Sequence, residues 1–387
     1  MTSGKIRGLG AGLLAGACAG LLDVAALLNA APALADDAVP VAPIDYTALV
    51  LGHAFLSQPD ATYMQEVIDT YVDNPTDFGQ PQYTITGDPV SVYTPETDYS
   101  PGLTQGVADL NSQITPLLTA DPDAALVVTG YSMSTSVITQ EMINLAAAGV
   151  TDPNLKFVLA EDLQTPNGGY FTRFPDFAGA NLPATPVDTG YETTIYSIEY
   201  SGASDYPEYT SNIYADINAS DGYLDLHPYL LPGWPAYFDP STVADAVKEN
   251  VSTADVNTDY YLIPTQDLPM LNDLRDAPGA PSAFADLIQP DMRVLVDLGY
   301  DWTGNADVTT VATSASPDID FTAVNDYLSA GADQGMIAYL VDLNILPQDD
   351  LAGIADAYPY APDVANLMSG ALTDNDAAAL DASTSLG

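Results

Sequence analysis

The pentapeptide Gly130-Tyr131-Ser132-Met133-Ser134 is the segment whose residue types and spacing point most directly to chemistry. A serine with small residues two positions before and two after it is typical of a nucleophile elbow, a sharp turn between a strand and a helix. The turn lifts the serine hydroxyl above the sheet, and the backbone N–H of Met133 at the helix start would face an oxyanion. The alternative is that Ser132 only caps the helix, because serine is a favoured N-cap residue.

A serine nucleophile needs a general base, and the chain has two histidines, His53 and His227. In α/β hydrolases the chain order is serine, acid, histidine, and only His227 lies downstream of Ser132. His227 is therefore the predicted base. The alternative is an ordinary histidine in a surface loop.

The acid that orients the histidine is predicted to be Asp205, because it follows a late expected strand. Asp216, Asp221 and Asp225 are rival candidates. Asp225 is the weakest of them, since only one residue separates it from His227.

The first expected strand ends at Gly52, and His53 and Ala54 follow it. The loop at this point usually donates the second N–H of an oxyanion hole in such enzymes. We assign the backbone around His53 and Ala54 to that role, beside Met133. The alternative is that His53 forms part of a pocket wall.

Short apolar runs alternate with amphipathic stretches in the first 200 residues. The expected strands are 46–51, 83–93, 124–129, 155–159 and 194–198. The expected helices are 59–72, 102–118 and a stretch that runs from the Ser132 turn to Gly149. This alternation predicts an α/β-hydrolase fold, with a mostly parallel central sheet and helices on both faces. The second half is less regular, with expected helices at 241–251, 285–299 and 326–343 and a strand at 260–264.

The chain has 387 residues, with 53 Asp and Glu against 7 Lys and Arg, so its formal net charge is −46. This surplus argues against nucleic acid as a partner and predicts repulsion from anionic membranes. Apolar residues make up 47% of the chain, enough for a large core despite the charge. A single cysteine, Cys18, excludes a disulfide framework. No EF-hand pattern accompanies the acidic residues, so we read them as a solvated surface and expect neither a metal nor a cofactor.

The N-terminus is typical of an export signal. Lys5 and Arg7 precede an apolar run over 9–22, and Ala33-Leu34-Ala35 fits the small-x-small cleavage rule. We predict cleavage after Ala35 and a secreted or cell-envelope protein; an uncleaved anchor and lipidation at Cys18 are the alternatives. The expected segments are a signal peptide (1–35), a lead-in (36–44), the hydrolase domain (45–345) and a partly flexible C-terminal extension (346–387).

Several segments, in order, carry a likeness to a known family: 49–52, 130–134, 166–169 with 173–174, 199–207, 261–265 with 268–269, and 287–300. Through them the chain resembles the PE-PPE C-terminal domain family of mycobacteria and related actinobacteria, a branch of the serine α/β hydrolases. The likeness covers roughly residues 45–345. It implies a Ser-Asp-His triad with a Gly-x-Ser-x-Ser/Gly motif, and Ser132 matches that motif.

The chain departs from the family pattern at three points. The family's acid lies in a Tyr-Asp-Gly-x-x-Asp-Phe-Pro-like stretch; here Ser201 replaces the first aspartate, and Asp205 stands as the second. His227 matches the family histidine in position, but Pro228 replaces the glycine that follows it. The Gly-Gly-Thr-Gly turn after the first strand reads Gly-His-Ala-Phe over 52–55.

The residues and the resemblance together predict a secreted serine esterase or lipase that hydrolyses short-to-medium acyl esters through an acyl-enzyme on Ser132. One alternative is an acyltransferase that moves acyl chains onto trehalose-type glycolipids. Another is a non-catalytic envelope or lipid-binding protein on a hydrolase fold. The Tyr-rich stretch 206–237 is expected to line an acyl groove or lid, with ordinary packing as the alternative. The expected partners are an acyl-ester or glycolipid substrate and, peripherally, the cell envelope, with no obligate protein partner.

Overall fold

The computed structural model describes residues 44–73, 83–95, 99–177, 182–227, 243, 246–252, 257–277 and 280–347. The predicted signal segment, nearly all of the lead-in and nearly all of the C-terminal extension lie outside the described residues. Of the Tyr-rich stretch, the part beyond His227 also lies outside them. In the described part of the chain, no helix combines the length and the apolar character needed to cross a membrane.

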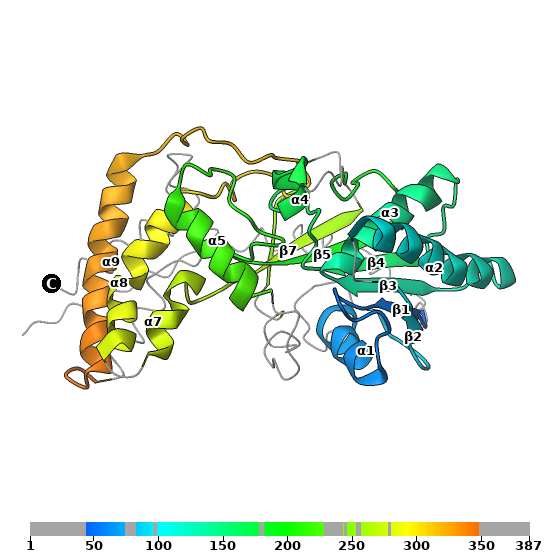
Figure 1. The fold of residues 1–387 in the computed structure, drawn as a ribbon, viewed down its shortest axis with the longest axis horizontal. Helices are drawn as coiled ribbons and strands as arrows, with labels where there is room; N and C mark the ends of the chain where they lie inside the picture. The colour runs from blue at the N-terminus through cyan, green and yellow to red at the C-terminus, as the bar shows by residue number, and fades with distance from the viewer. Residues whose placement is uncertain are drawn as a thin grey trace, which may run out of the picture. The chain divides into compact units, whose positions relative to one another are not determined.

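Within the described residues, seven strands form one sheet in the order β2-β1-β3-β4-β5-β7-β6 (Figure 1). They are β1 (Thr47–Leu51), β2 (Val90–Val92), β3 (Leu126–Tyr131), β4 (Leu155–Ala160), β5 (Glu192–Ile198), β6 (Val247–Lys248) and β7 (Thr258–Ile263). All neighbouring strands run parallel except β6, which pairs antiparallel with β7. The sheet and its helices confirm the predicted α/β class. The strand β3 is buried along its whole length, as expected for a parallel sheet covered on both faces.

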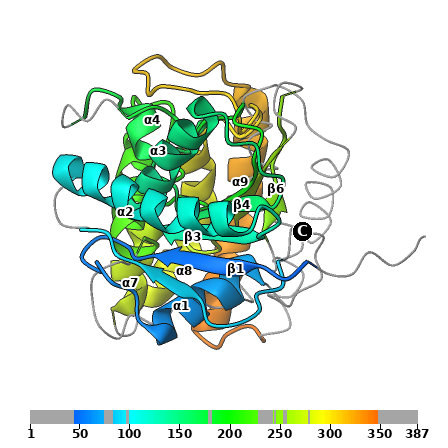
Figure 2. The ribbon, with the colours of Figure 1, turned by 90° about the vertical axis from the view of Figure 1, so that its right-hand side faces the viewer.

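Helices cover both faces of this sheet. They are α1 (Ala61–Val67), a π-helical turn η1 (Ile68–Val72), α2 (Tyr99–Ala120), α3 (Met133–Ala147), α4 (Tyr170–Arg173), α5 (Ile213–Asp225), a 3₁₀ turn η3 (Pro269–Leu271), α7 (Asn272–Asp276), α8 (Ala280–Asp297) and α9 (Phe321–Asp342). Figure 2 shows α1 on one side of the strands and α2 and α3 on the other. Alternate residues of β3 belong to two hydrophobic clusters: Val127 lies in the cluster that contains Val67 and Tyr71, and Val128 lies in the cluster that contains Val137 and Leu110.

Two expected elements differ in the structure. The predicted helix over 241–251 is wrong in its second half, where 247–248 form the edge strand β6, whereas Val243 is helical. The predicted strand over 83–93 is shorter, since 90–92 form the strand beside β1 and Ile85 makes only an isolated bridge with Tyr46. Pairing with a neighbouring strand decides both cases, and residue type alone does not encode that pairing.

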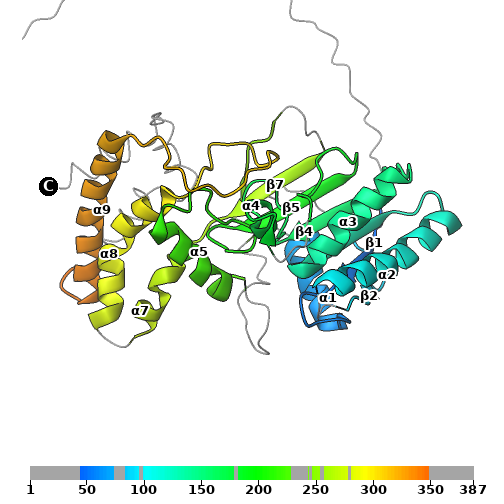
Figure 3. The same cartoon turned by 45° about the horizontal axis from the view of Figure 1, so that its top comes forward.

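The helices α8 and α9 lie side by side, on the left of Figure 3 and away from β1 and β2. Their close approach depends on glycine in α9. A Cβ atom placed on Gly335 would lie 2.0 Å from the carbonyl oxygen of Leu287, and one on Gly331 would lie 2.4 Å from Asp291 Oδ1. Any larger residue there would force the two helices apart.

A buried polar cluster joins α8 to the end of β5. Arg293 Nη2 donates to Glu199 Oε1 at 2.6 Å, and both side chains are buried. The hydroxyl of Tyr200 donates to Asp297 Oδ1 at 2.5 Å. Burial raises the pKa of Asp297 to about 8, although the nearby Arg293 acts in the opposite direction. Folded Asp297 is therefore mostly protonated at neutral pH.

The raised pKa of Asp297 makes the stability of the fold depend on pH. The folded pKa of Asp297 lies above its unfolded value, so the folded chain binds the extra proton, and the free energy of unfolding falls as pH rises from about 4 to 8. We expect Asp297→Asn to reduce that fall by on the order of a few kcal/mol. Urea unfolding at pH 5 and pH 8 measures it. Other acidic side chains contribute the same slope to both proteins, so equal slopes in the variant and the parent would contradict the assignment.

Candidate active site

Ser132 lies in the tight connection between β3 and α3, where the sequence pattern places it. Its backbone has φ 60° and ψ −126°, a conformation that a non-glycine residue rarely adopts. A Cβ atom on Gly130 would lie 2.5 Å from Ser134 Oγ and 2.8 Å from Ile138 Cδ1, so only glycine fits before the turn. The Ser134 hydroxyl donates to the carbonyl of Tyr131 and accepts from its N–H, both at 3.0 Å. These contacts fix the geometry of a nucleophile elbow.

The structure brings Ser132 and His227 together, as predicted. Ser132 Oγ lies 2.7 Å from His227 Nε2, and both side chains are buried. The imidazole stacks on Tyr131 and on Tyr223, with ring centroids 5.4 Å and 5.3 Å apart. His227 follows α5, and its backbone N–H donates to the carbonyl of Gly222 at 3.1 Å. Stacking and backbone contact together hold the ring against the serine.

The carboxylate beside His227 is Glu161 and not the predicted Asp205. Glu161 Oε2 lies 2.8 Å from His227 Nδ1, and both side chains are buried. Asp205 instead accepts from the Tyr200 N–H at 2.9 Å and from Trp302 Nε1 at 3.3 Å. Burial raises the pKa of Asp205 to about 7. Its oxygens are thus engaged in a different cluster.

The rival aspartates lie on α5. Asp225 accepts from Asn272 Nδ2 at 2.8 Å. Burial raises the pKa values of Asp216 and Asp221, and Asp216 is hydrogen-bonded to Tyr206.

Sheet register explains how Glu161 reaches the site. Tyr131 of β3 pairs with Ala160 of β4, so Ser132 and Glu161 each follow one member of the last paired position. The Ser132 N–H donates to the carbonyl of Ala160 at 3.2 Å. Glu161 itself adopts φ 55°. In the sequence, Glu161 could have been recognised as a candidate because it is a carboxylate that closely follows an expected buried strand and is one of only eight glutamates in the chain.

Three further donors hold the Glu161 carboxylate. The Ile198 N–H donates to Oε1 at 2.8 Å. The hydroxyl of Ser204 donates to the same oxygen, and the hydroxyl of Ser201 donates to Oε2, the oxygen that faces His227. Ser201 is the residue that stands where the family resemblance expects its first aspartate. In place of that aspartate, Ser201 donates a hydrogen bond to Glu161, which follows the strand β4.

The loop after β1 reaches the same site. Ala54 and Phe55 line the cavity at Ser132, whereas His53 Nδ1 lies 2.6 Å from the carbonyl oxygen of Ala54. Burial lowers the pKa of His53. On the other side, α3 begins at Met133, and the first N–H groups of a helix have no acceptor within the helix. Met133 and Ala54 therefore line the cavity beside Ser132, and the oxyanion hole at Met133 and the 53–54 loop stays a prediction.

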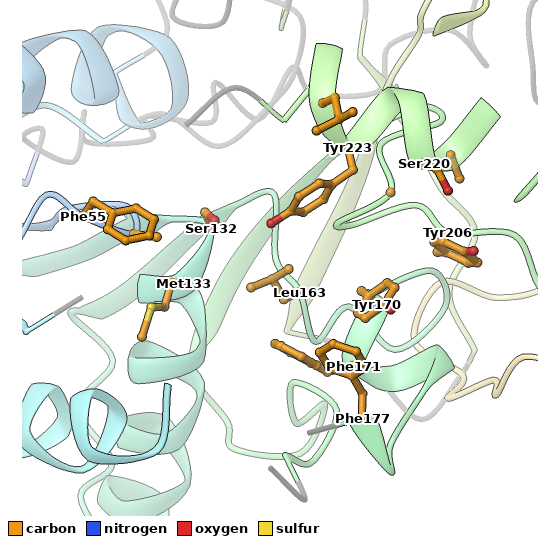
Figure 4. A pocket seen from close by; sticks show the side chains of 14 residues that line it. Phe55, Ser132, Met133, Leu163, Tyr170, Phe171, Phe177, Tyr206, Ser220 and Tyr223 are labelled. Carbon is orange, nitrogen blue, oxygen red and sulfur yellow. The ribbon is translucent and has the colours of Figure 1, made fainter. Parts of the chain in front are cut away.

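A cavity of about 620 Å³ opens at Ser132 and is mostly apolar. Figure 4 shows Ser132 between Phe55 and Tyr223, with a group of aromatic rings farther along the cavity. The side chains of that group are Tyr170, Phe171, Phe177 and Tyr206. From the Tyr-rich stretch, Tyr206 and Tyr223 line the cavity as expected. Among the described residues, no three His, Cys, Asp or Glu side chains gather closely enough to hold a metal ion.

Comparison with known proteins places the chain in a family. The PE-PPE domain matches residues 68–301, more than half of the chain. This chain belongs to the PE-PPE domain family. Esterase PE16 of Mycobacterium tuberculosis is 37% identical over 302 residues, which cover 73% of this chain and 54% of that protein. PE family protein PE3 of the same organism is 38% identical over 295 residues, covering 71% and 60%.

A more distant relative carries a different activity in its name. SL1278 acyltransferase Chp1 of Mycobacterium tuberculosis is 27% identical over 187 residues, which cover 46% of this chain and 44% of that protein. This PE-PPE chain thus spans between 44% and 60% of the length of these three curated relatives.

Proposed function

We propose that this chain is a serine esterase or lipase that hydrolyses short-to-medium acyl esters through an acyl-enzyme on Ser132. One observation carries the proposal. Ser132 Oγ, His227 and Glu161 form a continuous hydrogen-bonded chain, with distances of 2.7 Å and 2.8 Å, beside an apolar cavity. The relative named as an esterase supports the same class of reaction.

The geometry supports the following course. Ser132 Oγ attacks the ester carbonyl while His227 Nε2 takes the hydroxyl proton. Glu161 stabilises the imidazolium that forms and keeps Nδ1 as the donor. The N–H of Met133 and the backbone of the His53–Ala54 loop receive the oxyanion. His227 then protonates the leaving alcohol, and water, activated by the same histidine, hydrolyses the acyl-enzyme.

The cavity supports an uncharged, apolar acyl group as the substrate portion next to Ser132. Its volume of about 620 Å³ lies within the range of ordinary ligand pockets. Its walls are mostly aromatic and aliphatic, and none of the described residues that line it carries a formal charge. Turnover of p-nitrophenyl esters of increasing chain length, with the released acid quantified, tests the proposal. A folded protein that hydrolyses none of them would contradict it.

If a sugar hydroxyl rather than water attacks the acyl-enzyme, the acyl group is transferred to the sugar and the protein acts as an acyltransferase. The relative named as an acyltransferase favours this second candidate. Product analysis with and without a trehalose-type glycolipid acceptor separates the two. Acyl-glycolipid formed at the expense of free acid would favour transfer, and free acid in both reactions would favour hydrolysis.

Export is part of the proposal. The N-terminal pattern supports cleavage after Ala35 and a secreted or envelope-associated mature protein. Sequencing the N-terminus of protein recovered from the culture medium and the envelope fraction tests it. A mature chain that begins at Asp36 is the expected result.

The serines around Glu161 give a separate prediction. Because Ser201 and Ser204 donate to the carboxylate, Ser201→Ala or Ser204→Ala leaves Glu161 less firmly oriented. We expect kcat to fall about tenfold in each variant, with KM nearly unchanged. Ser201→Thr retains the hydroxyl and should recover most of the rate. If the threonine variant is as slow as the alanine variant, the hydroxyl is not the operative group.

A further inference from the structure

The outward face of α5 is apolar in a chain that is otherwise strongly acidic. Ile213 is 64% exposed, Ile217 43% and Leu224 58%. At 3.6 residues per turn these three side chains lie along one side of the helix, with Ser220 between them. The opposite side, with Ala215, is buried against the protein. A surface helix normally turns charged or polar residues outward, so this arrangement needs an explanation.

This apolar face adjoins the mouth of the cavity. Ser220 and Leu224 belong to the exposed side of α5 and also line the cavity at Ser132. Phe55, 65% exposed, and Phe177, about half exposed, line the same cavity from other parts of the chain. Exposed apolar side chains thus extend from the reactive serine out onto the surface. Single apolar residues scattered over a surface are ordinary, but an exposed apolar patch that continues into an apolar cavity is typical of a binding surface.

The negative charge of the chain limits the kinds of surface to which α5 could bind. The formal net charge is −46, and Asp216 and Asp221 flank the apolar face on α5. Anionic lipid would be repelled, and an uncharged lipid surface would not. Burial of the exposed isoleucines and Leu224 among acyl chains removes apolar area from water.

We propose that the apolar face of α5, together with the cavity mouth, docks on an uncharged lipid surface that presents acyl esters to Ser132. This inference rests on the proposed esterase function. It makes an aggregated lipid ester the substrate form. Acyl chains would pass from the lipid phase directly into the cavity, without crossing water.

The double variant Ile213→Asp/Ile217→Asp tests this surface, because neither isoleucine lines the cavity. Phe321→Asp/Ile345→Asp is the matched control: both residues are at least 64% exposed, on α9 and just beyond it, and it adds the same two charges. Binding is measured by flotation with phosphatidylcholine vesicles, with and without phosphatidylglycerol. Hydrolysis is measured on soluble p-nitrophenyl acetate and on emulsified tributyrin.

We expect the parent chain and the α9 control to float with phosphatidylcholine vesicles, and phosphatidylglycerol to weaken this binding. The α5 variant should lose about tenfold or more of both the binding and the tributyrin activity, while its p-nitrophenyl acetate activity stays within about twofold. Equal binding by the α5 variant, or no binding by the parent, overturns the docking proposal. A parent chain that dimerises without lipid and becomes monomeric in the α5 variant also overturns it, in favour of an interface between copies. A parent chain that binds vesicles but hydrolyses neither ester overturns the proposed function alone.

Discussion

Ser132→Ala and His227→Ala are each expected to lower kcat for ester hydrolysis by about 10⁴-fold or more. Ser132 Oγ is the nucleophile in this account, and His227 Nε2, 2.7 Å away, is the group that takes its proton. The two residues act as one unit, so the double variant should be no slower than either single variant. If the loss of kcat in the double variant is the product of the two single losses, the two residues do not share one proton transfer.

The control for this experiment is another serine. Ser112 is exposed on α2, and its hydroxyl donates to the carbonyl of Asp109, so Ser112→Ala should leave the rate unchanged. Urea unfolding of each variant shows whether the fold persists. A folded Ser132→Ala protein that keeps the parent rate would remove Ser132 from the mechanism.

Glu161→Gln is expected to lower kcat by about 10²- to 10⁴-fold, because glutamine cannot stabilise the imidazolium and can present its amide to Nδ1. Asp205→Asn is the matched control. Both carboxyls are buried, but Asp205 bonds Tyr200 and Trp302 rather than His227. Burial raises the pKa of Asp205 to about 7, so asparagine resembles the protonated form that it already adopts in part at neutral pH.

The two variants therefore separate the acid shown by the geometry from the acid predicted by sequence order. Asp205→Asn should keep kcat within about tenfold of the parent. A large loss in Asp205→Asn and a small one in Glu161→Gln would reverse the assignment. Glu161→Asp is informative too, since it keeps the charge but shortens the reach, and it should be slower than the parent while remaining faster than Glu161→Gln.

Local pattern was sufficient to predict Ser132 and His227. The elbow needs small residues at Gly130 and Ser134, and these are visible in five consecutive letters. His227 followed from scarcity, because the chain has only one histidine downstream of the serine. Both features, the small residues around Ser132 and the single downstream histidine, can be seen in the sequence without knowledge of the fold.

The acid could not be predicted in the same way. The position of Glu161 depends on the register in which Tyr131 pairs with Ala160, and that register is fixed by packing between distant segments. Chain order favoured a carboxylate after a later strand, and 45 aspartates offered many candidates. Ser201 was visible as a departure from the family pattern. Its meaning as a donor to Glu161 emerges only when β4 and β5 lie side by side.

The same distinction holds for the fold. Central strands such as β3 are mostly apolar and buried along their whole length, and their composition predicts them. The edge strand β6 is two residues long and exposed, and it forms because Lys248 pairs with Tyr261 of β7. Nothing in its own residues distinguishes it from a helical stretch.

The most direct test of the central claim is the rate at which a fluorophosphonate labels the protein, with the labelled residue mapped by peptide mass spectrometry. Labelling reports an activated serine without requiring the natural substrate. We expect fast labelling at Ser132 in the parent and in Asp205→Asn, much slower labelling in Glu161→Gln, and none in Ser132→Ala or His227→Ala. A folded parent chain that is not labelled, or that is labelled at another serine, would contradict it.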